Sequence, residues 1–206
     1  MDFSKEQAIP PQQQGQQADI VEKMHASHTF QAKSVFHDAK MRLLDISEWG
    51  TISDGMSACF HLTDQFGNMK NGLPEVGDHI RINIPGPGSS AGKGYDWVRI
   101  ELVKEGTDTK SEFAAIKVRP SADPQKREGT AHFFDRSATS SFMIVREGCV
   151  ITAEIHGRNE EPNTESKKLP DKVRNLVVGT AATIGLAKIQ WRKLAKGLLN
   201  FKTTSS

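Results

Sequence analysis

The run AEIHGRNEEPN (residues 153–163) holds the side chains of this sequence that are best suited to acid–base chemistry. They are Glu154, His156, Arg158, Asn159 and Glu160. In an extended strand Glu154, His156 and Arg158 lie on one face, where a carboxylate could orient the imidazole and the guanidinium could bind an oxyanion or a carboxylate. The alternative is a solvated face followed by a turn, which the nearby Pro162 favours.

Three further residues are candidate ligand-binding groups. Trp97 and Arg99 share one face of the strand expected over residues 96–103, and either could anchor a ligand. His132 lies beside two phenylalanines, where burial could shift its pKa and make it a proton carrier. The alternative for His132 is a hydrogen-bonded core histidine.

Sequence motifs for other chemistries are incomplete. The Gly-rich run over residues 85–94 lacks the spacing and the hydroxyl of a phosphate-binding loop, and it is expected to be a flexible hairpin loop. The histidines form no HExxH and no other set at metal-ligand spacing, and no serine lies in a G-x-S-x-G elbow. We therefore expect no metal and no cofactor, and we assign no catalytic residue.

Charge and hydropathy limit the partners. The 27 Lys and Arg against 25 Asp and Glu leave a formal charge of +2, too small to indicate nucleic acid. Cations near the end of the chain are expected to complement a helix dipole. No run approaches the roughly 18 apolar residues of a membrane span, and no leader pattern opens the chain. The expected location is the cytoplasm, without stable membrane insertion, and the oligomeric state is left open.

Alternating hydrophobicity and turn residues predict a series of antiparallel strands. The sequence predicts them over residues 29–37, 56–63, 78–84, 96–103, 113–119, 131–134, 140–146 and 149–156. The alternation is clearest over residues 97–102, where Val98, Ile100 and Leu102 oppose polar or amphipathic neighbours. A helix is expected over residues 39–49.

The longest periodic segment begins at Pro170. Apolar residues recur at three- and four-residue steps as far as Leu198, which predicts a long amphipathic helix that packs on a broad surface. Residues 1–26, rich in Pro and Gln, are expected to be a disordered or weakly ordered tail. Residues 27–202 are expected to form one domain and residues 203–206 to fray. The predicted fold is α+β: a curved antiparallel sheet of six to seven strands around a long C-terminal helix.

Two short runs of the sequence support a family resemblance. The run AKMRLLDISEW (residues 39–49) is similar to the early helix of the START-like helix-grip (SRPBCC) superfamily, the polyketide cyclase and lipid-transfer type, and VGDHI (residues 76–80) is similar to its entry into a strand. The element order also resembles that superfamily over about residues 28–201. The resemblance implies a cavity between the sheet and the terminal helix, used for hydrophobic ligands and in some branches for catalysis.

Three functions remain open at this point. The first is binding of a small apolar or amphipathic molecule in that cavity, anchored by Trp97, Arg99, His132, Glu154, His156 or Arg158. The second is a cyclase- or hydrolase-like enzyme that uses a His, Glu and Arg set in the cavity. The third is a non-catalytic interaction protein whose core is filled.

Overall fold

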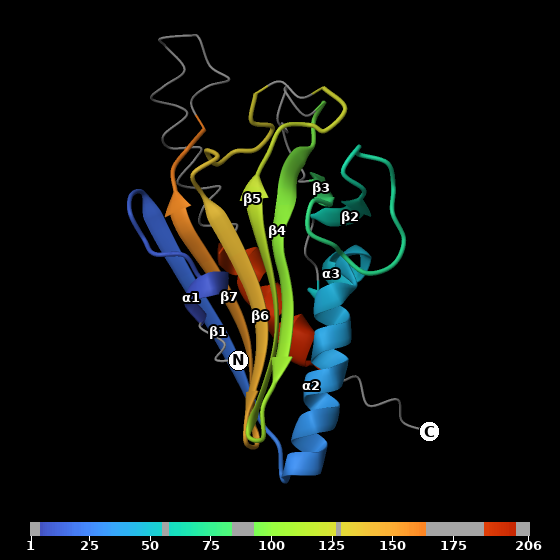
Figure 1. The fold of residues 1–206 in the computed structure, drawn as a ribbon, viewed down its shortest axis with the longest axis vertical. Helices are drawn as coiled ribbons and strands as arrows, with labels where there is room; N and C mark the ends of the chain where they lie inside the picture. The colour runs from blue at the N-terminus through green and yellow to red at the C-terminus, as the bar shows by residue number, and fades with distance from the viewer. Residues whose placement is uncertain (1–4, 55–57, 84–92, 127–128, 164–187, 201–206) are drawn as a thin grey trace.

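The computed structural model describes residues 5–54, 58–83, 93–126, 129–163 and 188–200. Within these residues, seven strands form one antiparallel sheet in the order β1-β7-β6-β5-β4-β3-β2 (Figure 1). The strands are β1 (Gln16–His25), β2 (Cys59–Thr63), β3 (His79–Asn83), β4 (Asp96–Thr107), β5 (Ser111–Pro120), β6 (Thr139–Glu147) and β7 (Val150–Glu160). Strands β2 to β7 form a meander, and β1 pairs with β7, so β1 and β2 are the edges of the sheet.

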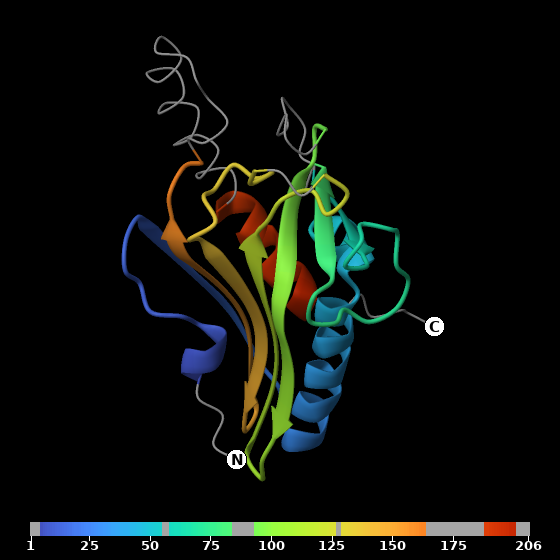
Figure 2. The same cartoon turned by 45° about the horizontal axis from the view of Figure 1, so that its top comes forward.

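The helices cover the two faces of the sheet unequally. The elements are α1 (Lys5–Ala8), α2 (Thr29–Leu44), the 3-10 turn η1 (Ile46–Glu48), α3 (Trp49–Ile52) and a terminal helix over residues 188–199. The terminal helix and α2 lie on one face, called here the inner face, and α1 lies against the other, the outer face (Figures 1 and 2). A seven-stranded antiparallel sheet with the terminal helix against one face is a helix-grip arrangement, so the predicted α+β fold class is confirmed.

The main core lies between the inner face and these helices. In β7, Ile151, Ala153 and Ile155 alternate into it, and Val98 and Ile100 of β4 do the same. A side chain points to the opposite face at each step along a strand, so the residues between them face outward. A smaller apolar cluster on the outer face joins Ala8 to strands β5 and β6.

The N-terminal predictions were wrong. Residues 16–25 are not part of a tail but form β1, which buries Ala18 and Ile20 against β7, so the domain begins before residue 27. Residues 29–37, predicted as a strand, lie within α2. Their buried residues Ala32, Val35 and Phe36 recur at the helical spacing, and the His28 imidazole accepts a hydrogen bond from the Gln31 backbone at the helix start.

The other predicted elements fall into three groups. The strands predicted from residue 56 onward are confirmed with shifted ends, apart from residues 131–134, which are irregular and contribute only an isolated bridge between Phe134 and Pro162. The helix predicted over residues 39–49 is divided among α2, η1 and α3. The terminal helix is confirmed over residues 188–199, while its predicted first part and residues 203–206 lie outside the described residues.

Candidate functional site

Glu154, His156 and Arg158 share one face of β7, as predicted, but it is the outer face. The edge strand β1 supplies their partner, because Asp19 lies opposite His156 in the register. The Nδ1 atom of His156 is 2.6 Å from Oδ1 of Asp19, and its Nε2 atom is 3.1 Å from Oε2 of Glu154. The Arg158 guanidinium donates to the same Asp19 oxygen at 2.7 Å. The four side chains therefore form an ion network that ties β1 to β7.

The network favours a protonated imidazole. Burial would lower the pKa of His156, but the hydrogen bonds and negative charges of Glu154 and Asp19 outweigh it and raise that pKa. Burial would raise the pKa of Asp19, but the hydrogen bonds and charges of His156 and Arg158 lower it. Both ring nitrogens are thus committed to carboxylates, which suits a structural cation better than a general base.

Trp97 and Arg99 also lie on the outer face, on β4. Trp97 is buried, and its indole ring packs edge-on against His79 of β3 with ring centroids 6.5 Å apart. Within the described residues, neither the Trp97 Nε1 atom nor the His79 Nδ1 atom has a hydrogen-bond partner. Burial and the charge of Arg99 lower the pKa of His79. Trp97 and His79 are therefore buried on this face, while Arg99 is exposed.

His132 is a core histidine of the loop between β5 and β6. Its Nδ1 atom accepts a hydrogen bond from the Phe134 backbone at 2.9 Å, and its ring stacks on Phe133 with centroids 4.4 Å apart. Burial lowers the pKa of His132 to about 3. The imidazole is therefore neutral near neutral pH and acts as an acceptor that holds the loop, and the proton-carrier role expected for it is not supported.

None of the six predicted anchors lies between the sheet and the terminal helix. Five are outer-face residues of β4 and β7, and the sixth, His132, is in a loop. The placement predicted for them was wrong because the apolar residues that alternate with them occupy the inner face.

The described end of the terminal helix is closely packed on the inner face. The Trp191 ring contacts Phe142 and Phe60, with centroids 5.3 and 6.2 Å away, and Trp49 packs on Phe142 at 4.7 Å. A Cβ atom added at Gly197 would lie 2.0 Å from the backbone oxygen of Ile52, so glycine permits this close approach. Aromatic side chains therefore fill the space beneath this part of the helix.

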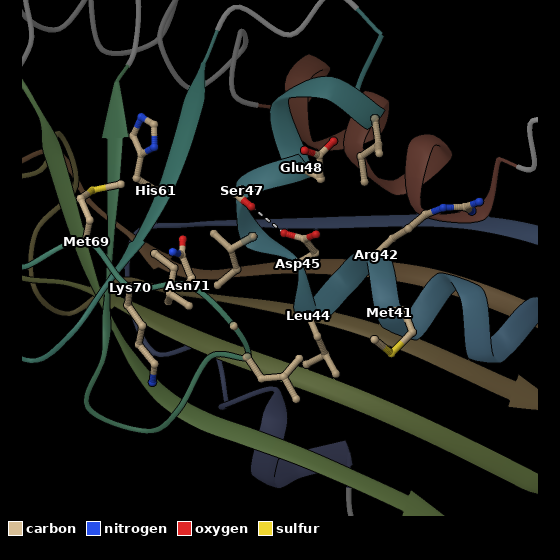
Figure 3. A pocket seen from close by; sticks show the side chains of 15 residues that line it. Met41, Arg42, Leu44, Asp45, Ser47, Glu48, His61, Met69, Lys70 and Asn71 are labelled. Atoms are coloured by element: carbon tan, nitrogen blue, oxygen red, sulfur yellow. Dashed lines mark hydrogen bonds between the residues drawn. The ribbon is translucent and has the colours of Figure 1, made fainter.

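An open groove of about 610 Å³ lies beside the edge strand β2. One wall is the end of α2 with η1 and α3, and the other is β2 with residues 69–73 of the β2–β3 connection (Figure 3). Its apolar lining comprises Met41, Leu44, Ile46, Ile52, Leu62, Met69 and Leu73. Its polar lining comprises Arg42, Asp45, Ser47, Glu48, His61, Lys70, Asn71 and the backbone of Gly72. Met41, Met69 and Leu73 are each about half exposed.

The charged groups at the groove are largely paired with protein groups. Lys70 bridges Glu75 and Asp78 at 2.7 Å each, and Arg42 donates to the backbone oxygen of Leu198 at 3.2 Å. The Ser47 hydroxyl donates to Asp45 at 2.6 Å across the turn (Figure 3). The groove therefore has both apolar and polar lining, without a strong excess of either charge.

Sequence reasoning missed both Asp19 and this groove. Asp19 is 137 positions from its partner His156, so only the register of β1 on β7 joins them. The groove combines two chain segments that are not adjacent in the sequence. The signal available in the sequence was weak: the apolar residues Met69 and Leu73 stand among the Asn and Gly residues of this connection.

Two features are absent from the residues that the structure describes. No group of three or more His, Cys, Asp and Glu side chains is arranged there to hold a metal ion. Among the helices that the structure describes, none combines the length and the apolar character needed to cross a membrane.

Comparison with known proteins gives similarities to solved structures alone. No protein-family model and no curated protein matches the chain. The hypothetical protein jhp0584 from Helicobacter pylori is 10% identical, with 95% of this chain and 94% of that chain covered and a TM-score of 0.44. Truncated norcoclaurine synthase from Thalictrum flavum is 14% identical, with 90% and 96% covered and a TM-score of 0.41. Major latex-like protein 151 from Panax ginseng is 11% identical, with 84% and 99% covered and a TM-score of 0.34.

Proposed function

We propose that the protein is a binding module for a small amphipathic molecule and that the groove beside β2 is its site. The observation that carries this proposal is the combination of volume and lining. A volume of about 610 Å³ is within the range of small-molecule sites. Three large apolar side chains, Met41, Met69 and Leu73, remain about half exposed around it. Apolar surface gathered in a concavity indicates an interaction site more strongly than the same residues scattered singly.

The lining also sets the orientation of the ligand. The apolar part would contact the thioethers of Met41 and Met69 and the Leu73 side chain, since methionine adapts to ligands of irregular shape. The polar part would lie beside Ser47 and Asn71, where hydroxyl and amide groups can donate and accept hydrogen bonds. This placement differs from the sheet–helix cavity that the family resemblance implies, because the described end of the terminal helix is packed against aromatic residues.

Fluorescence titration with the amphipathic dye anilinonaphthalene sulfonate tests the proposal. We expect saturable binding to the wild type, weakened about tenfold or more in Leu73→Glu, because losing the burial of one leucine removes at least about 1.5 kcal/mol. Amide chemical shifts of residues 41–48 and 69–73 should change on titration. Val76→Glu is the matched control, since Val76 is exposed in the same connection but does not line the groove.

Two outcomes would contradict the assignment. Equal dye affinity for the wild type and Leu73→Glu would place the dye elsewhere. Failure of the folded protein to bind the dye or a set of fatty acids and aromatic carboxylic acids would favour an interaction protein with a filled core.

A further inference from the structure

A second, smaller pocket lies between the outer face of the sheet and the segment that joins α1 to β1. Its volume is about 260 Å³. One wall is that segment, with Pro10 and Pro11, and the other wall is formed by Arg119 of β5, Thr139 of β6 and Asn159 of β7. Sites for drug-sized ligands usually exceed about 300 Å³, so this pocket suits a smaller molecule.

Thr139 gives this pocket a buried hydroxyl without a partner. It lies two residues before Ser141, whose hydroxyl donates to the backbone oxygen of Ala8, so the side chain of Thr139 shares the outer face. The residue is 1% exposed, and within the part of the chain that the structure describes its Oγ1 atom forms no hydrogen bond. A valine would fill the same space without the cost of burying a hydroxyl. The hydroxyl therefore calls for a specific explanation.

Asn159 adds an amide nitrogen to the pocket. It lies at the bulge where the pairing of β7 with β1 shifts register, in a left-handed conformation with a φ of 54° that Asn tolerates better than most residues. Its Oδ1 atom accepts hydrogen bonds from the backbone amides of Gln13 and Gln14 at 2.8 and 3.3 Å. With the oxygen used in this way, the group that Asn159 can offer to a ligand is its Nδ2 amide, which only donates.

Arg119 brings a positive charge to the same place. Its Nε and Nη2 atoms donate to the Glu101 carboxylate, and its Nη1 atom donates to the backbone oxygens of residues 136 and 137. Of the five N–H groups of the guanidinium, the second one on Nη2 remains for another partner. The Glu101 carboxylate is also 3.6 Å from Nζ of Lys117. Two cations thus share one carboxylate, which leaves a positive charge beside the pocket.

We propose that this pocket binds a small carboxylate, at a site separate from the groove beside β2 and independent of it. The groups that Thr139, Asn159 and Arg119 can offer are all hydrogen-bond donors, and an ionised carboxylate only accepts. A charged acceptor forms stronger hydrogen bonds with such donors than a neutral one, and the positive charge of Arg119 and Lys117 favours an anion. Pro10 and Pro11 would contact a short apolar tail, so the expected ligand is a short-chain monocarboxylic acid.

Acetate, propionate and butyrate, each compared with the amide of the same chain length, test the proposal. Each would be titrated into the full chain at constant ionic strength, with the backbone amides of residues 137–141 and 159 followed by NMR. We expect at least one carboxylate to shift these signals saturably and to bind about tenfold more weakly to Thr139→Val, the loss expected for one hydrogen bond to a charged group. The matching amide should bind the wild type more weakly than the carboxylate does.

A second measurement separates binding from folding. Thr139→Val should keep or raise the free energy of unfolding, because it removes a buried hydroxyl that has no partner among the described residues. Thr107→Val is the matched control, since it makes the same change at an exposed position of β4, and it should keep the carboxylate affinity of the wild type. Leu73→Glu should also keep that affinity, which separates this site from the groove.

Three results would overturn the proposal. The first is that no carboxylate of the series shifts the amides of residues 137–141 and 159. The second is that Thr139→Val binds the carboxylates as tightly as the wild type. The third is that the amides bind as tightly as the carboxylates, because the charge of the ligand would then not be recognised.

Discussion

Replacing His156 with glutamine should remove a pH-dependent part of the stability of the protein. His156 and Glu154 are a buried pair, each with a side chain 9% exposed. Removing one partner of a buried ion pair costs about 3–5 kcal/mol. We expect the lower end, about 3 kcal/mol, because the Thr152 hydroxyl still donates to Oε1 of Glu154 at 2.8 Å in the variant. The Asp19 side chain is 41% exposed, so solvent screens its attraction to His156, and this attraction adds little to the 3 kcal/mol.

The sign of the pH dependence follows from the raised pKa of His156. The protonated imidazole stabilises the fold fully below the pKa of an unfolded histidine, about 6.5. This contribution is lost as the pH rises through the higher pKa of the folded state. The lowered pKa of Asp19 has the opposite effect, because its contribution is lost as the pH falls through the folded value. The wild type should therefore be most stable at pH values between the lowered pKa of Asp19 and the raised pKa of His156, and it should lose stability below and above that range.

Urea unfolding at a series of pH values measures this effect. The free energy of unfolding of the wild type should fall as the pH rises above about 6.5, and His156→Gln should lack that fall. His37→Gln is the control, since His37 is exposed on α2. A variant that keeps the slope of the wild type, or loses less than about 1 kcal/mol near pH 6, would refute the assignment of a buried cation to His156.

Two further variants test the packing of the two faces. Gly197→Ala should lower the free energy of unfolding by about 1–3 kcal/mol, because its Cβ atom would meet the backbone oxygen of Ile52. Thermal unfolding would measure this loss, with Lys196→Ala as the control because Lys196 is exposed on the same helix. Ala8→Asp would bury an unpaired carboxylate in the outer cluster, so the amides of residues 5–14 should exchange faster with solvent while those of the sheet remain protected. Unchanged exchange in residues 5–14 would show that Ala8 does not hold this segment.

Strands with a clear two-residue period were the part of the fold that sequence reasoning predicted well. Val98 and Ile100 on β4, and Ile151, Ala153 and Ile155 on β7, alternate with polar neighbours, and the structure places all five in the core. The same pattern already contained the correction to the predicted site. When apolar residues take one face of a strand, their polar neighbours face away from the core, so Glu154 and His156 had to be outer-face residues.

The N-terminal part was predicted poorly because its cues are weak or mixed. Ala32, Val35 and Phe36 fit a short strand with an irregularity as well as a helix, and only packing against β6 and β7 decides between them. Residues 12–14 look like a tail by composition, yet backbone groups of Gln13 and Gln14 donate to the Asn159 side chain, a contact between opposite ends of the domain. Such long-range partners cannot be read from a local pattern.

Residues 154–160 of β7 place carboxylates on both faces of the sheet. On the outer face, the side chains of Glu154 and His156 form a hydrogen bond with each other, and His156 also binds Asp19 of the edge strand β1. Their charges therefore stabilise the pairing of the two strands. The bulge at Asn159 then interrupts the alternation, and the next carboxylate, Glu160, is buried on the same side of the strand as Gly157. Glycine at position 157 is what permits this placement, because a Cβ atom there would overlap the Glu160 carboxylate.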